Sequence, residues 1–72
     1  MLHVIPQNDT KHWSIYSGPE TGEISQDSLG TITLCKQGFQ VVFGDKHSLC
    51  KSMDSATAWL EAVSHERVMV FG

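Results

Sequence analysis

Histidine and cysteine are the side chains here best suited to hold a metal ion, and the chain contains four histidines and two cysteines. Imidazole nitrogens and thiolates are the usual ligands of structural zinc. His47 and Cys50 have an H-x-x-C spacing, but residues three apart on a strand point to opposite faces of a sheet. The chain has no C-x-x-C pair and no second close pair of ligands. We therefore expect neither a metal nor another cofactor.

Serine, histidine and aspartate also occur, and these types supply the nucleophile, the base and the orienting carboxylate of hydrolytic enzymes. Their spacing does not bring them together, because the chain has no G-x-S-x-G elbow and no glycine-rich phosphate loop. A chain of 72 residues also has little material to enclose a ligand pocket of about 300 Å³ or more. We therefore expect that the protein is not an enzyme.

Acidic side chains gather in one stretch, where Glu20, Glu23 and Asp27 occur without a lysine or arginine between residues 17 and 35. Eight acidic against five basic residues give a net charge of −3, which argues against a dedicated duplex-DNA binder. The first hypothesis is a small acidic protein-binding module. It would act as an adaptor or inhibitor that occludes a basic, nucleic-acid-binding surface of a larger host or cognate protein.

Basic side chains gather further along the chain, at Lys36, Lys46, His47 and Lys51. If these residues share one sheet face, they form a small positive surface. The alternative hypothesis is therefore a weak nucleic-acid-binding module that uses this lysine-bearing face. Single-strand binders commonly add exposed aromatic residues for base stacking, and the phenylalanines of this region are expected in the core.

The elements that must position these residues form a small α+β fold in a single domain, residues 1–72. Residues 31–35 and 39–43 alternate apolar and polar side chains, as half-buried strands do. They predict a three-stranded antiparallel meander over residues 30–51. Pairing Leu34 with Phe39, and Ile32 with Val41, keeps their apolar side chains on one face.

Further elements flank this meander. We expect an N-terminal strand near residues 12–17, a further strand at residues 2–5 and a C-terminal strand at 68–71. A helix at about 54–65, preceded by capping serines, should pack on one face of the antiparallel sheet. Small phage and mobile-element proteins often have this plan, which by fold-level analogy suggests an adaptor or inhibitor of that type. The helix carries one apolar stripe, formed by Met53, Ala56, Leu60 and Val63.

Cys35 and Cys50 fall on the two outer strands of the meander. Strands two apart are about 9–10 Å from each other, whereas the Cα atoms of a disulfide lie about 4.4–6.8 Å apart. We therefore expect two free thiols. The first six residues lack the basic region and apolar run of a secretory signal, and no apolar run reaches the roughly 20 residues that cross a bilayer. These features predict a cytoplasmic protein with no membrane partner.

Two more features are candidates for binding a partner. Trp13 and Tyr16 point to opposite faces of their strand and are candidate aromatic anchors, although core packing is the commoner role of tryptophan. The apolar C-terminal strand, residues 68–71, would form a homodimer by edge pairing if it lay at the edge of the sheet. We favour an interior position for it.

Overall fold

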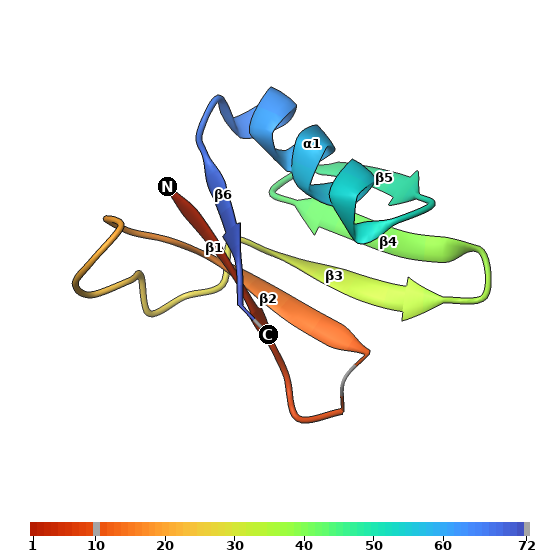
Figure 1. The fold of residues 1–72 in the computed structure, drawn as a ribbon, viewed down its shortest axis with the longest axis horizontal. Coiled ribbons are helices and arrows are strands. Elements are labelled where there is room, and N and C mark those ends of the chain that lie inside the picture. Colours follow the sequence, from red (N-terminus) through yellow and green to blue (C-terminus); the bar gives the residue numbers. More distant parts are fainter. Residues whose placement is uncertain (10, 72) are drawn as a thin grey trace.

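The structure is a computed structural model that describes residues 1–9 and 11–71, and it confirms the small α+β fold (Figure 1). One mixed sheet packs against one helix. In chain order the elements are β1 (Leu2–Pro6), β2 (His12–Ser17), β3 (Gly30–Cys35), β4 (Gly38–Phe43), β5 (Lys46–Cys50), α1 (Met53–Ser64) and β6 (Val68–Val70). The predicted helix and C-terminal strand are thus correct to within one residue at each end.

The strands lie in the order β5-β4-β3-β2-β1-β6. The first five form an antiparallel meander in which each strand pairs with the next. An entirely antiparallel sheet was the expectation, but β6 pairs in parallel with β1. The physical reason is the helix: α1 returns the chain to the end of the sheet where β1 begins, so β6 must run in the same direction as β1.

The register of the central hairpin is the one that the apolar pattern predicts. Leu34 lies opposite Phe39, and Ile32 lies opposite Val41. Gly44 begins the two-residue turn into β5 with φ +62°, a conformation that glycine adopts without a steric penalty.

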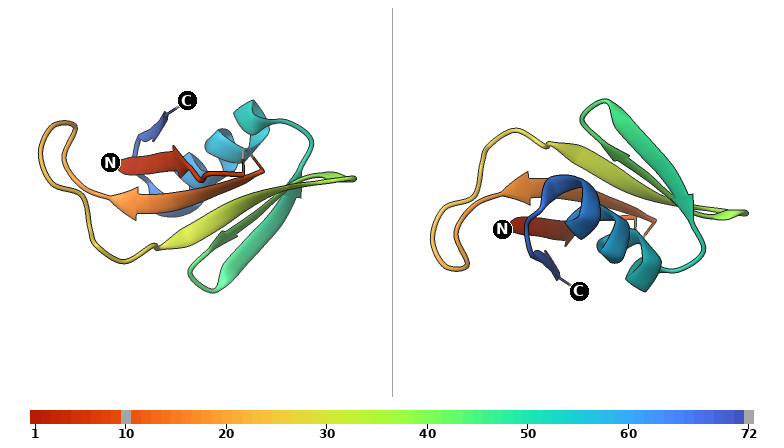
Figure 2. Two further views of the ribbon diagram at one scale, coloured as in Figure 1. Left: turned by 90° about the horizontal axis from the view of Figure 1, so that it is seen from below. Right: turned by 90° about the horizontal axis from the view of Figure 1, so that it is seen from above.

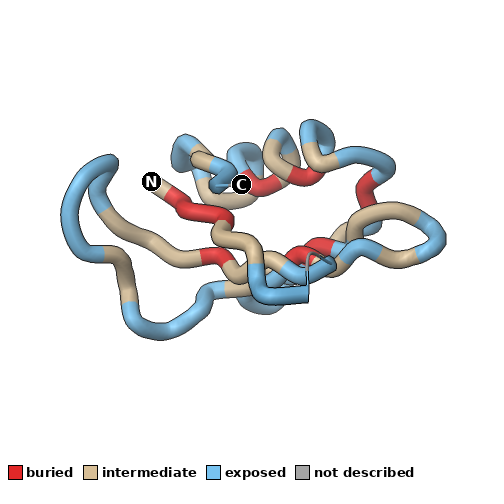
Figure 3. Tube along the Cα trace, turned by 60° about the horizontal axis from the view of Figure 1, so that its bottom comes forward, coloured by how far each residue is buried: buried red, intermediate tan, exposed pale blue. Residues whose placement is uncertain are grey.

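The core lies between α1 and one face of the sheet, and Figure 3 shows the buried positions gathered where the two face each other. Each of the strands β1 to β5 contributes at least one side chain to this core, as expected when a single sheet packs under one helix. Ala56 and Leu60, the centre of the predicted stripe, are fully buried. The apolar core residues are Leu2, Val4, Ile15, Ile32, Val41, Cys50, Ala56 and Leu60.

Leu34 was expected in the core, on the same face as Ile32, but this residue is 40% exposed. It lies near the end of β3, whereas α1 packs mainly against β4, β5 and β6. The alternation predicts the face of a residue, but it does not predict how far the helix extends over that face.

The ends of α1 follow from local chemistry. Ser52 is extended and its hydroxyl accepts a hydrogen bond from the backbone N–H of Ser55 at 3.1 Å, which caps the first turn. At the other end His65 is left-handed, with φ 59°, and its N–H donates to the carbonyl of Glu61 at 2.9 Å. A non-glycine residue in this conformation is under backbone strain.

Candidate functional site

No pocket is found in the structure as described, and no three metal-binding side chains among residues 1–9 and 11–71 lie close enough to share an ion. The thiols of Cys35 and Cys50 are free, as predicted. Cys50 is in the core opposite Phe39, whereas Cys35 and His47 point to the other face of the sheet by register. His47 and Cys50 therefore cannot chelate one ion.

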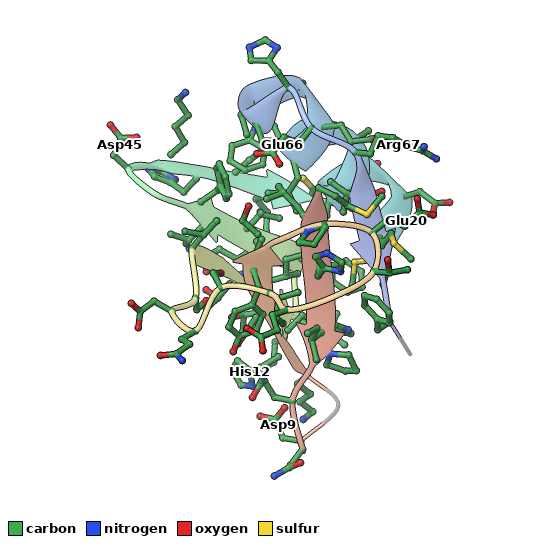
Figure 4. All side chains as sticks on the ribbon, turned by 90° about the vertical axis from the view of Figure 1, so that its left-hand side faces the viewer. Asp9, His12, Glu20, Asp45, Glu66 and Arg67 are labelled. Atoms are coloured by element: carbon green, nitrogen blue, oxygen red, sulfur yellow. The ribbon has the colours of Figure 1, made fainter. Side chains whose placement is uncertain are left out.

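The meander sorts the charged residues into two ends of the sheet, because successive turns of an antiparallel meander lie at alternate ends. We call the end formed by residues 18–29 and 44–45 the loop end. It holds Glu20, Glu23, Asp27 and Asp45, all exposed, and one lysine, Lys46, at the start of β5. Glu66 and Arg67, which precede β6, are exposed at the same end, and the Met1 ammonium donates to Glu66 at 2.7 Å. Figure 4 looks onto this end and shows Glu20 and Asp45 on opposite sides of it.

The opposite end, formed by residues 7–9, 11, 36–37 and 51–52, is called the lysine end. Lys11, Lys36 and Lys51 are all exposed there. A backbone hydrogen bond holds Lys11 next to the end of β3: the Leu34 N–H donates to the Lys11 carbonyl at 2.8 Å. No sequence pattern indicates Lys11, because only the β2–β3 pairing brings it to the same end of the sheet as Lys36.

Carboxylates reduce the positive charge of the lysine end. Asp9 accepts hydrogen bonds from the backbone N–H groups of Lys11 at 3.0 Å and His12 at 3.1 Å, and its side chain pairs with the His12 ring (Figure 4). The Lys11 amide, then the His12 ring, hold the pKa of the Asp9 carboxyl below its ordinary value of 3.8. Asp54 lies in the first turn of α1, at the same end of the sheet. The lysine end therefore carries three lysines and two carboxylates.

The acidic residues lie in a loop that is held at both ends by backbone hydrogen bonds. At its start Gly18 N–H donates to the carbonyl of Met1 at 3.0 Å, and at its end Leu29 N–H donates to the carbonyl of Ile15 at 2.7 Å. Between them Ser25 N–H donates to the carbonyl of Ser17 at 2.7 Å. The loop projects beyond the sheet (Figure 2), yet its backbone is tied to β1 and β2.

His3 forms a further tie to this loop, and sequence reasoning missed it. Its side chain is buried, at 4% exposure, and its Nε2 donates to the carbonyl of Pro19 at 3.0 Å. Because a carbonyl oxygen only accepts, Nε2 must carry a proton. The ring also stacks on Phe71, with centroids 5.7 Å apart. His3 thus joins β1, the acidic loop and the segment after β6, a contact that no local pattern signals.

The four candidate residues of the basic hairpin do not form one surface. Lys36 and Lys51 are at the lysine end, whereas Lys46 is at the loop end, at the other end of β5. His47 lies between them but points to the face away from α1, and Lys46 points to the face that α1 covers. The structure therefore divides the proposed lysine-bearing face between two ends and two faces.

The two aromatic candidates do lie on opposite faces of β2, as predicted, but neither is fully exposed. Trp13 packs against the core beside Phe39, with ring centroids 5.8 Å apart, so it supplies core volume. Tyr16 lies on the other face, opposite His3, and is half-buried. Of the pair, Tyr16 remains the better candidate for contact with a partner.

The face of the sheet opposite α1 is uncovered over β3, β4 and β5. Figure 2 shows the helix in front of the strands from one side and behind them from the other. Leu49 and Val42 are 55% and 37% exposed on this face, diagonal to each other across the β4–β5 pair. By register the face consists of Thr31, Thr33, Cys35, Gln40, Val42, His47 and Leu49, and we call it the neutral face.

The C-terminal strand is at the edge of the sheet, which corrects the interior position that we favoured. β6 pairs with β1 on one side only, because the crossover through α1 delivers the chain to the edge beyond β1. Val68 packs against the core, whereas Val70 and Phe71 are 43% and 41% exposed. β5 forms the other edge, with Lys46 as its first residue and Lys51 directly after its last.

The one helix of the described residues, α1, is too short and too polar to cross a bilayer. Comparisons with protein-family models, with curated proteins and with solved structures gave no match. Function is therefore inferred from the surfaces of the molecule.

Proposed function

We propose that this chain is a small acidic protein-binding module that engages a basic surface of a larger protein through Glu20, Glu23 and Asp27. The observation that carries this proposal is the separation of charge between the two ends of the sheet. The loop end carries five acidic residues against Lys46, Arg67 and the Met1 ammonium, and Glu66 is already paired with that ammonium. The lysine end carries the opposite excess, because its three lysines outnumber the carboxylates of Asp9 and Asp54.

The anchoring of the acidic loop supports the same function. A loop that is already held by hydrogen bonds loses less conformational entropy on binding, so more of the interaction energy contributes to affinity. Its backbone bonds to Met1 and Ile15, and the His3 contact with Pro19, provide such anchoring. The exposed carboxylates would attract a basic partner at long range and raise the association rate more than the affinity.

The class of partner follows from this charge. A basic surface that binds nucleic acid is the natural target of a rigid acidic loop, so the module would act as an adaptor or inhibitor that occludes such a surface. Such an inhibitor would be of the phage or mobile-element type that binds a host protein. The nucleic-acid alternative is weaker, because Lys36, Lys46, His47 and Lys51 do not share a face.

Affinity capture from nuclease-treated lysate of the source cells tests the proposal. We expect basic proteins among the captured partners, and about tenfold less capture when Glu20→Gln, Glu23→Gln and Asp27→Asn are combined, since each exposed ion pair contributes roughly 0.2–1 kcal/mol. The control removes the helix charges of Asp54 and Glu61 by Asp54→Asn with Glu61→Gln. Equal losses in the two variants would mean that net charge, and not the loop, determines capture.

A mobility-shift titration with a single-stranded oligonucleotide at two salt concentrations tests the alternative. The proposal predicts no shift at low salt. A salt-dependent shift that is lost on combining Lys36→Gln with Lys51→Gln would replace it with the nucleic-acid function, because phosphate contacts impose a steep salt dependence.

A further inference from the structure

The neutral face is open to solvent, yet none of its seven side chains is an aspartate, glutamate, lysine or arginine. Charged residues make up 18% of the chain, and they lie on its turns, loops and helix and at the ends of its strands. The solvated face of an antiparallel sheet usually carries polar and charged side chains. Depletion of charge is instead the mark of an interface core. A face of this composition can be buried against another surface without the cost of desolvating a formal charge.

We propose that the neutral face is covered by the same face of a second copy of this chain, packed sheet on sheet about a two-fold axis. Each copy has a net charge of −3, so two copies repel each other over most of their surfaces. A contact between identical faces brings like charges together unless the face carries none, and the neutral face meets this condition. A partner with a strongly charged contact surface would find no complementary charge here.

The arrangement of side chains on this face suits a two-fold contact. Val42 on β4 and Leu49 on the edge strand β5 form an apolar pair, and Thr31, Gln40 and His47 next to them can donate and accept hydrogen bonds. In an isologous interface both copies use the same patch, so the apolar pair of one copy can pack against that of the other while the polar side chains form hydrogen bonds. The contact leaves the loop end of each copy free.

The size of the face indicates a weak dimer. Three strands about 4.8 Å apart, each about 20 Å long, cover roughly 290 Å² in projection, and the relief of the side chains enlarges the accessible area. Two copies cover about 580 Å² in projection, and the side-chain relief raises the buried accessible area to roughly 1,000 Å². This value is at the low end for specific interfaces. Dimer formation should therefore depend steeply on concentration in the micromolar range.

The edges of the sheet are less suitable for self-association than this face. β6 has three residues, so edge pairing through it would form few hydrogen bonds. β5 begins with Lys46 and is followed by Lys51, and lysines at an edge strand oppose pairing with another sheet. Edge pairing through β6, the homodimer considered from the sequence, is therefore the competing outcome of the test.

Sedimentation velocity of the full chain, from roughly 5 µM to roughly 500 µM, measures the association. We expect a concentration-dependent monomer–dimer equilibrium in the unaltered chain and a dissociation constant at least about tenfold higher for Leu49→Lys, which places an ammonium group in the contact. Leu29→Lys is the matched control, because Leu29 is also an exposed leucine, at 40%, but lies in the acidic loop. Circular dichroism checks that each variant is folded.

An NMR dilution series of the unaltered chain locates the contact without a substitution. The proposal predicts that the amide shifts that change with concentration lie on β3, β4 and β5. A chain that stays monomeric at the highest concentration overturns the proposal. So does a dimer that resists Leu49→Lys but is lost with Val70→Lys and shows its shifts on β6, because that result would establish edge pairing instead.

Discussion

Substitution of Leu60 by alanine tests the assignment of the core to the face beneath α1. Leu60 is fully buried in the described structure, at the centre of the contact between helix and sheet. Truncation of a buried leucine costs about 3–5 kcal/mol, because the transfer free energy of the lost methyl groups adds to the cost of the cavity. A domain of 72 residues has a total stability of about 4–11 kcal/mol, at 0.05–0.15 kcal/mol per residue. The change therefore removes a large part of the stability.

The expected fall in melting temperature follows from the unfolding entropy. At about 2.1 cal/mol/K per residue, 72 residues give about 0.15 kcal/mol/K. A loss of about 3 kcal/mol then lowers the Tm by about 20 °C. Thermal unfolding followed by circular dichroism at low micromolar concentration measures it, in the range where the proposed dimer is dissociated.

Leu49→Ala is the matched control, since it is the same substitution at a residue that is 55% exposed on the neutral face. We expect a cost below about 0.5 kcal/mol, or about 3 °C. A fall in Tm as large as that of Leu60→Ala would refute the reasoning, because it would mean that the monomer needs both faces of the sheet to be covered.

Three further predictions concern the backbone and one carboxylate. Gly30→Ala should prevent folding, as judged by circular dichroism, because the added Cβ would lie 2.0 Å from a carbonyl oxygen of β4. His65→Gly should raise the Tm by about 3–7 °C, because glycine relieves roughly 0.5–1 kcal/mol of strain at the left-handed C-cap. The third concerns the lowered pKa of the Asp9 carboxyl, whose ionised form the Lys11 amide and the His12 ring favour in the folded state. This stabilisation is present above the unfolded pKa near 3.8 and is lost as the pH falls through the lower folded pKa. Asp9→Asn should therefore lower the Tm at pH 7 and leave it unchanged near pH 2, and an equal fall at both would contradict this.

Several elements could be predicted from the sequence because they depend on neighbours in the chain. The alternation of residues 31–35 and 39–43 is sufficient to set the register of Ile32 opposite Val41, since one slip of register would turn every apolar side chain to solvent. Ser52 and the apolar stripe predict the helix in the same local way. The separation of Cys35 and Cys50 needs only the order of three adjacent strands.

The candidate site was harder to predict, because it is formed by segments that are distant in sequence. Glu20, Glu23 and Asp27 were recognisable as a group, since they are close together along the chain. The basic group was also chosen by proximity in sequence, and this failed, because a strand carries Lys46 and Lys51 to opposite ends of the sheet. Proximity along a strand is not proximity in space when each residue advances the chain by about 3.3 Å.

The sequence by itself determined the elements of this protein, the pairing of the three strands within residues 30–51 and the free state of its two thiols. These are local properties, fixed by side-chain alternation and by short turns. Only the tertiary structure decided that β6 joins the sheet at its edge in parallel with β1, that His3 is buried against the acidic loop, and that the neutral face stays open. The position of β6 and the open face depend on the path of α1, which crosses one face of the sheet and returns the chain beside its first strand. The burial of His3 depends on the acidic loop and Phe71 covering the other face of β1, and no local pattern specifies either arrangement.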